Sequence, residues 1–131
     1  MKYKKEAVER FSRDLYATKT TGIVIEEVAP DYAKCSLTVK DFHLNAAGFV
    51  MGGALFTLAD FAFAVASNCE NPLTVTLTSQ INYLSATKGP LLWAEARCVK
   101  SSKKIGFYEI EIHDNQGTLV AKVSATGYRK S

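Results

Sequence analysis

The segment from Gly52 to Asn68 constrains the fold more than any other part of the chain, because it is apolar around almost its whole circumference. It is longer than an ordinary strand, and it is shorter than the ~20 residues that a membrane-spanning helix needs. A helix that is hydrophobic on every side must also be covered on every side. The segment therefore predicts a central helix around which the rest of the chain is wrapped.

The residues on both sides of this segment have the patterns of strands. Apolar and polar residues alternate over 33–39, which predicts a half-exposed strand, and residues 23–29 are rich in β-formers. Turn sequences separate four further expected strands, at 74–83, 91–100, 105–113 and 118–129. A four-residue apolar spacing predicts an amphipathic helix over 4–18. Because strands joined by short turns pair antiparallel, we expect an α+β fold with one curved antiparallel sheet wrapped around the central helix.

Length and composition limit the class of protein. With 131 residues, 47% of them hydrophobic, the chain is expected to form a single domain over 1–131. It has no membrane-spanning run, no signal peptide pattern and no clustered basic face, so we expect neither a membrane nor a nucleic-acid partner. Three scattered cysteines and two separated histidines indicate no disulfide framework and no metal site, which favours a cytoplasmic location.

Asp60 is the only ionisable residue in the central segment. A carboxylate in apolar surroundings is costly unless it is paired or hydrogen-bonded, and desolvation raises its pKa toward the range of a general base. The pattern fits a second interpretation equally well, in which Asp60 is a structural acid that accepts a bond from a backbone amide or pairs with a cation.

Glycines gather where the central helix is expected to begin, at Gly48, Gly52 and Gly53. They let backbone approach a ligand closely, and the free N–H groups of a helix N-terminus stabilise developing negative charge. A tight loop entering a crowded helix is the alternative. Gly52 and Asp60 are separated by about 12 Å along a helix axis, so one carbonyl cannot contact both in the same helix. If both serve one reaction, they come from different protomers of a two-fold dimer.

The residues from Asn45 to Gly53, followed by the helix that carries Asp60, resemble the signature of hotdog-fold acyl-CoA thioesterases, most closely the phenylacetate-pathway (PaaI-like) group. The pattern of that group is Asn-x-x-Gly-x-x-His-Gly-Gly followed by an apolar helix with an acid. The resemblance implies a hotdog fold, a homodimer that often forms a homotetramer, and hydrolysis of an acyl-CoA thioester. Coenzyme A is then part of the substrate, and no separate cofactor is expected.

The resemblance also assigns roles by position. Asp60 becomes the general base or nucleophile, the Gly52 amide binds the thioester oxygen, Asn45 orients the water or the carbonyl from the partner chain, and Thr76 replaces a helper serine. In a strictly alternating strand Thr76 lies opposite the face of Ile81, so it either lines the site or is only a β-former. The residues expected to contact substrate are His43, Gly48, Met51, Gly53, Phe56, Phe63, Lys103 and Lys104.

Simpler interpretations exist for three of these residues. A solvated or capping role explains His43 better than contact with substrate, and an ordinary solvated turn explains Lys103 and Lys104 more simply than attraction for the phosphates of coenzyme A.

One position departs from the family pattern, since Met51 replaces the histidine of His-Gly-Gly. This change weakens the polarisation of the thioester or reshapes the pocket with a flexible apolar side chain. The apolar residues around the expected site predict an apolar acyl group, either aryl-acetyl or medium-chain. The sequence thus favours an acyl-CoA thioesterase. An acyl-CoA-binding hotdog protein without turnover is the alternative that Met51 favours, and a structural oligomeric module is a third.

Overall fold

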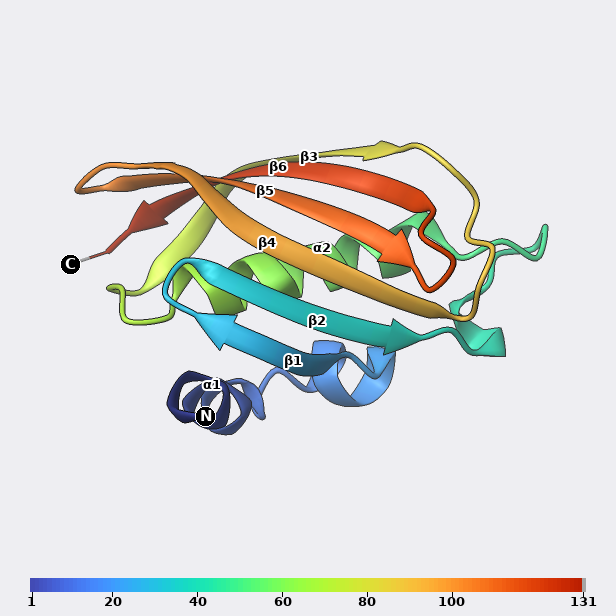
Figure 1. Cartoon of the computed structure of the whole chain (residues 1–131), viewed down its shortest axis with the longest axis horizontal. Coiled ribbons are helices and arrows are strands. Elements are labelled where there is room, and N and C mark those ends of the chain that lie inside the picture. The colour runs from blue at the N-terminus through green and yellow to red at the C-terminus, as the bar shows by residue number, and fades with distance from the viewer. Residues whose placement is uncertain (131) are drawn as a thin grey trace.

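A curved six-stranded sheet surrounds one long helix in the computed structural model, which describes residues 1–130 (Figure 1). The strand order is β1-β2-β4-β5-β6-β3, and every neighbouring pair is antiparallel. All six expected strands are present, and each observed end lies within one residue of the expected end. They are β1 (Val24–Ala29), β2 (Tyr32–Thr38), β3 (Thr74–Tyr83), β4 (Leu91–Ser101), β5 (Ile105–Asp114) and β6 (Leu119–Arg129).

The central helix α2 (Gly52–Ser67) lies on the concave side of this sheet, which confirms the expected hotdog architecture (Figure 1). Its sheet-facing residues, such as Leu58 and Ala62, are completely buried. One stripe along the helix stays partly exposed, and its members recur every three or four positions: Gly53, Thr57, Asp60 and Ala64. A single chain therefore leaves one flank of α2 uncovered. No helix among residues 1–130 has both the length and the apolar character needed to cross a membrane.

The first helix is shorter than predicted. The helix α1 (Lys2–Phe11) is followed by a π-helical turn, η1 (Tyr16–Thr21), instead of continuing to residue 18. A π-helical turn contains more residues than an α-helical turn, so the four-residue apolar spacing is lost and Leu15 is 59% exposed. Gly22 ends η1 at φ +90°, a conformation that favours glycine. A short 3-10 helix, η2 (Asp41–His43), precedes the loop into α2.

Asp114, at the end of β5, holds two loops together. Its buried carboxylate accepts bonds from the N–H groups of Lys88 (2.7 Å), Gly89 (3.2 Å), Gln116 (2.9 Å) and Thr118 (2.9 Å). Burial alone raises the pKa of this group, but the four amide donors outweigh it and lower the pKa to about 2. The ionised form of Asp114 is thus the one that the fold stabilises.

This environment predicts an acid-sensitive contribution to stability. The pKa of Asp114 is lower in the folded chain than in the unfolded chain, so the stabilisation is complete above the ordinary aspartate pKa of about 3.9 and is lost as the pH falls to about 2. Asp114→Asn should lower the melting temperature at neutral pH, because the NH₂ group of the asparagine would face backbone N–H donors. The melting temperature of this variant should also depend less on pH in the acid range. Thermal unfolding between about pH 7 and pH 2 measures this. Exposed Asp41→Asn is the control, and an equally steep acid dependence in Asp114→Asn would contradict the assignment.

Candidate functional site

Asp60 projects from the uncovered flank of α2 into a cavity of about 280 Å³. The segment 14–17 forms one wall of this cavity, and Thr57, Phe61 and Ala64 of α2 form the other. The half-buried carboxylate has no hydrogen bond or ion pair with any group in residues 1–130. Burial raises its pKa, and the negative charge of Asp14 raises it further. The structural interpretation of Asp60 as an acid paired within its own chain is therefore not realised.

Sequence reasoning missed the residues that face Asp60. Asp14 and Tyr16 are the other ionisable side chains that line this cavity. They belong to the segment that was expected to continue the first helix, and no motif marks them. Only the break after Phe11 and the π-helical turn that follows it bring this segment against α2.

The other end of α2 presents free donors. Met51, the N-cap, is extended (φ −63°, ψ 137°) and makes no side-chain cap, while its carbonyl accepts bonds from the N–H groups of Ala54 and Leu55. The N–H groups of Gly52 and Gly53 donate to no acceptor in residues 1–130. Free amides at a helix N-terminus are the kind of donor that can stabilise an oxyanion, which is the role expected of this glycine pair.

Asn45 organises the loop before α2. Its side-chain oxygen accepts bonds from the N–H groups of Ala47 (2.9 Å) and Phe49 (3.1 Å), and Gly48 turns the chain at φ +86°. The oxygen of Asn45 is therefore occupied by its own loop. The NH₂ group has no partner among the described residues, so donation is the role left to this side chain toward a substrate or a water.

An apolar groove of about 510 Å³ lies beside Gly52. It is formed by the loop before α2, the first turn of α2, the end of β3 and the segment after β3. The hydroxyl of Tyr83 donates a bond to the Gly52 carbonyl (3.1 Å), which joins β3 to the start of α2. Sequence reasoning did not identify Tyr83 as a site residue. The residues around the groove are Phe49, Val50, Gly52, Leu55, Tyr83, Leu84, Ser85, Ala86 and Thr87.

A β-bulge corrects the expected orientation of Thr76. The pairing of β3 with β6 shifts between Thr76 and Thr78, so Leu77 is the extra residue. Thr76 pairs with Gly127. A Cβ built on Gly127 would point toward α2 and lie 3.0 Å from the Phe63 ring, so both members of this pair face the helix. Ile81 pairs with Val123, which is buried on the same face. Strict alternation therefore gave the wrong face, and Thr76 lies on the concave side of the sheet.

Two residues expected to contact substrate belong to the fold instead. His43 is 5% exposed; its Nδ1 accepts the N–H of Lys40 (2.9 Å), so its Nε2 donates to the Thr21 carbonyl (2.7 Å). Phe63 is buried against Tyr108, with ring centroids 5.2 Å apart. Neither side chain reaches a cavity that contains Gly52 or Asp60. The capping interpretation of His43 is the one that the structure supports.

The remaining predicted residues are dispersed. Met51 is 54% exposed beside the groove, Gly53 is exposed, and Phe56 is half-buried. Lys103 and Lys104 lie in the turn between β4 and β5, at the end of the sheet where β3 begins. Gly52 contacts Tyr83, at the other end of β3. The ten residues of this strand separate its two ends by about 30 Å, so the two lysines lie far from Gly52 of their own chain. Gly52 and Asp60 also line separate cavities, so one chain does not bring the candidate residues together.

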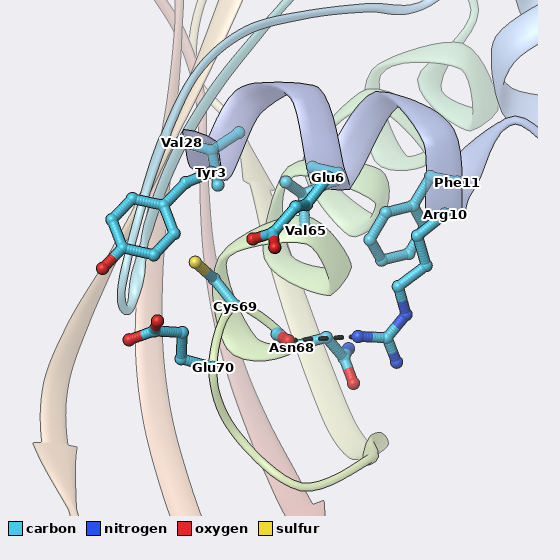
Figure 2. Close-up of a pocket in the computed structure, with 10 residues that line it drawn as sticks. Tyr3, Glu6, Arg10, Phe11, Val28, Val65, Asn68, Cys69 and Glu70 are labelled. Atoms are coloured by element: carbon cyan, nitrogen blue, oxygen red, sulfur yellow. Dashed lines mark hydrogen bonds between the residues drawn. The ribbon is translucent and has the colours of Figure 1, made fainter. Parts of the chain in front are cut away.

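A third cavity, of about 300 Å³, lies at the C-terminal end of α2 beneath α1 and contains none of the predicted residues (Figure 2). Arg10 extends across this cavity and donates a hydrogen bond to the Asn68 carbonyl (3.2 Å). Its positive charge there interacts favourably with the negative end of the α2 helix dipole. Burial raises the pKa of the Cys69 thiol in this cavity, so the thiol stays protonated. Residues 1–130 contain no group of three His, Cys, Asp or Glu side chains that could hold a metal ion.

Comparison with known proteins gives one consistent family. The model of the thioesterase superfamily matches residues 47–121. A provisionally assigned esterase of Archaeoglobus fulgidus is 35% identical over 96% of this chain and 85% of its own. The acyl-coenzyme A thioesterase PaaI of Escherichia coli is 34% identical over 85% of this chain and 80% of its own.

Solved structures agree with these matches. The PaaI protein from the phenylacetic acid degradation operon of Escherichia coli superposes with a TM-score of 0.91, covering 98% of this chain and 94% of that one at 28% identity. A hypothetical thioesterase of Streptococcus pneumoniae, solved with coenzyme A, has a TM-score of 0.85 over 95% and 97% of the two chains at 26% identity. Variants of that thioesterase in which an aspartate, or a threonine sixteen positions later, is replaced by alanine have also been solved.

Proposed function

The chain belongs to the thioesterase superfamily and is a thioester hydrolase of the PaaI type, and from this premise we propose that it hydrolyses the CoA thioester of an apolar acyl group, either aryl-acetyl or medium-chain. Asp60 of one protomer and the Gly52 amide of the other carry the reaction. The observation behind this proposal is the separation of the Asp60 carboxylate from the Gly52 amide, neither of which has a partner within residues 1–130, in different cavities along one helix.

Two uncovered surfaces support a two-fold dimer. The partly exposed stripe of α2 contains Asp60, and β3 is an edge strand with one unpaired side. Leu77 and Leu84, in and after β3, are 56% and 52% exposed. Pairing of two β3 strands across a two-fold axis would extend the sheet, satisfy its free backbone groups and remove these side chains from water. The two α2 helices would then lie antiparallel, with Gly52 of one facing Asp60 of the other.

The reaction follows from this arrangement. The thioester carbonyl oxygen accepts a bond from the N–H of Gly52, which stabilises the negative charge that forms as the carbonyl carbon is attacked. Asp60, as general base, takes a proton from the attacking water, the C–S bond then breaks, and the proton passes from Asp60 to the leaving sulfur, so that coenzyme A is released as a thiol. As a nucleophile, Asp60 would instead attack the carbonyl carbon directly, so that the C–S bond breaks, coenzyme A leaves as the thiolate, and the resulting acyl anhydride on Asp60 is hydrolysed by water. Its raised pKa makes the carboxylate a stronger base than an ordinary aspartate.

Thr76 and Asn45 complete the proposed site. The aspartate and threonine replaced in the Streptococcus pneumoniae thioesterase have the same sixteen-residue separation as Asp60 and Thr76. Thr76 is exposed on the concave face, where its hydroxyl can hold the water or the carboxylate. The unpartnered NH₂ group of Asn45 can orient the carbonyl or the water from the partner chain.

Coenzyme A would be bound by the partner's turn. Antiparallel pairing of two β3 strands sets the Thr74 end of one beside the Tyr83 end of the other. This brings Lys103 and Lys104 of one protomer toward Gly52 of its partner, although they are distant from Gly52 in their own chain. Their charges favour the phosphates of coenzyme A. A coenzyme A complex of the Streptococcus pneumoniae relative supports this class of ligand.

A thiol-release assay tests the proposed function. The protein is incubated with acyl-CoA esters of increasing chain length and with phenylacetyl-CoA and benzoyl-CoA, and free thiol is measured. Turnover that is fastest for phenylacetyl or medium-chain esters supports the proposal. Calorimetric binding of these esters without thiol release would contradict it and would identify a binding protein instead.

Met51 gives a more specific prediction. Met51→His restores the residue of the family pattern at the N-cap of α2, beside the free amides. An added donor near the developing oxyanion stabilises the transition state by about 1.4 kcal/mol, so kcat/KM should stay constant or rise by up to about tenfold. Met51→Leu, which is of similar size and adds no donor, is the control. Complete loss of activity in Met51→His would show that the methionine itself is required.

A further inference from the structure

Tyr83 is 54% exposed, and one hydrogen bond and a close approach to Gly52 place its side chain beside the proposed oxyanion site. Its hydroxyl bonds to the Gly52 carbonyl at 3.1 Å, and a Cβ added at Gly52 would lie 3.0 Å from the Cζ and Oη atoms of the ring. The ring therefore packs directly against the Cα of Gly52. A Cβ at position 52 therefore requires the Tyr83 ring to shift by a few tenths of an ångström.

The position of Gly52 determines which part of a thioester can reach Tyr83. A carbonyl oxygen bonded to the Gly52 amide lies about 3 Å from that nitrogen, so both substituents of the carbonyl carbon start within a few ångströms of the first turn of α2. One substituent is the acyl chain and the other leads to coenzyme A. The groove beside Gly52 is lined mainly by apolar side chains, Phe49, Leu55 and Leu84 among them, and it suits the acyl chain and not the charged cofactor portion.

We propose that Tyr83 is a specificity-determining residue, whose ring closes the groove beside Gly52 and limits the size of the acyl group that the enzyme accepts. This inference rests on the proposed function, because it needs the thioester carbonyl at the Gly52 amide. The bulge at Leu77 contributes to it: Tyr83 pairs with buried Ala121 and so shares the concave face with Thr76. One strand thus supplies both a residue near the reacting atoms and a wall of the groove.

Two variants separate the ring of Tyr83 from its hydroxyl. Tyr83→Ala removes the ring and should raise the kcat/KM ratio of a bulky ester, naphthylacetyl-CoA, to phenylacetyl-CoA by at least about tenfold, which is the change expected when one or two methylene-sized contacts are altered. Tyr83→Phe keeps the ring and should retain the wild-type ratio. Val99→Ala, at an exposed position of β4 outside the groove, is the control and should also retain it. Where Tyr83→Ala does not fold, Tyr83→Leu provides the smaller side chain.

The outcomes distinguish this inference from the proposed function. In one outcome, the wild type hydrolyses the esters, Asp60→Asn abolishes this hydrolysis, and the kcat/KM ratio of the two esters is unchanged in Tyr83→Ala and Tyr83→Leu. That outcome would overturn the role of Tyr83 alone. A wild type that releases no thiol from any ester would overturn the proposed function itself. A second readout uses the contact between Tyr83 and Gly52. The methyl group of Gly52→Ala displaces the Tyr83 ring, and any activity lost for this reason should be recovered in the double variant Gly52→Ala/Tyr83→Ala. Failure to recover that activity would count against the contact.

Discussion

Replacing Asp60 with asparagine is expected to lower kcat for thioester hydrolysis by about 10²–10⁴-fold while the protein stays folded. Asparagine has nearly the same shape as aspartate, but it can neither accept a proton from water at neutral pH nor act as a nucleophile. The wild-type rate should also fall on the acid side at a pH above the ordinary aspartate range, because burial raises the pKa of Asp60. Steady-state thiol release across a range of pH measures both effects.

The stability of the same variant tests the competing structural role. The pKa of Asp60 is higher in the folded chain than in the unfolded chain, so ionised Asp60 destabilises the fold at neutral pH and this cost disappears at acid pH. Asp60→Asn should therefore melt at the same or a higher temperature near neutral pH, as expected where activity is maintained at the expense of stability. Exposed Asp41→Asn controls for the loss of a charge. A lower melting temperature with unchanged hydrolysis would identify Asp60 as a structural acid.

Removing the N–H of Gly52 is expected to reduce kcat by about 10²–10³-fold, the usual effect of losing one oxyanion donor. Gly52→Pro does this with little change of backbone, because proline suits the first position of a helix and the preceding residue, Met51, already has the extended conformation (φ −63°, ψ 137°) that proline requires. Gly52→Ala is the control, since it also contacts the Tyr83 ring but keeps the amide. Equal losses in the two variants would show that bulk matters and the N–H does not.

Mixing the two inactive variants tests whether the site spans two chains. After co-refolding of Asp60→Asn with Gly52→Pro, random pairing makes about half of the dimers mixed, and each mixed dimer has one site with both Asp60 and Gly52 intact. Activity should return to about a quarter of the wild-type value per chain. Each variant refolded alone is the control. No recovery, with mixed dimers shown by mass spectrometry, would mean that both residues act within one chain.

Local patterns accounted for most of the fold. The alternation over residues 33–39 predicted β2, and the turn sequences after the helix predicted β3 to β6 with ends correct to within one residue. These patterns succeed because hydrophobic periodicity and turn chemistry act over a few neighbouring residues. The first helix was overextended, because a π-helical turn changes the spacing without a marker in the sequence.

The candidate site was predicted less completely. Asp60 and the Gly52–Gly53 pair were found because a lone acid and adjacent glycines contrast with an otherwise apolar segment. Thr76 was assigned to the wrong face, since one extra residue in a strand reverses the alternation that follows it. His43 and Phe63 were expected near substrate but are buried within the fold. Asp14 and Tyr83 were missed because they approach α2 from segments far away in the chain.

The order of amino acids alone was sufficient to establish an antiparallel sheet around an apolar helix, with one acid and one glycine pair too far apart on that helix to act together. Those properties depend on periodicity and on the rise of a helix, which are local. The chain's folded form was needed to show that Asp60 lies beside Asp14 with no partner in the described part of the chain, that Tyr83 touches Gly52, and that a flank of α2 and the edge of β3 lie open. Such properties depend on contacts between segments that are distant in the sequence, and short-range patterns of residues do not predict those contacts.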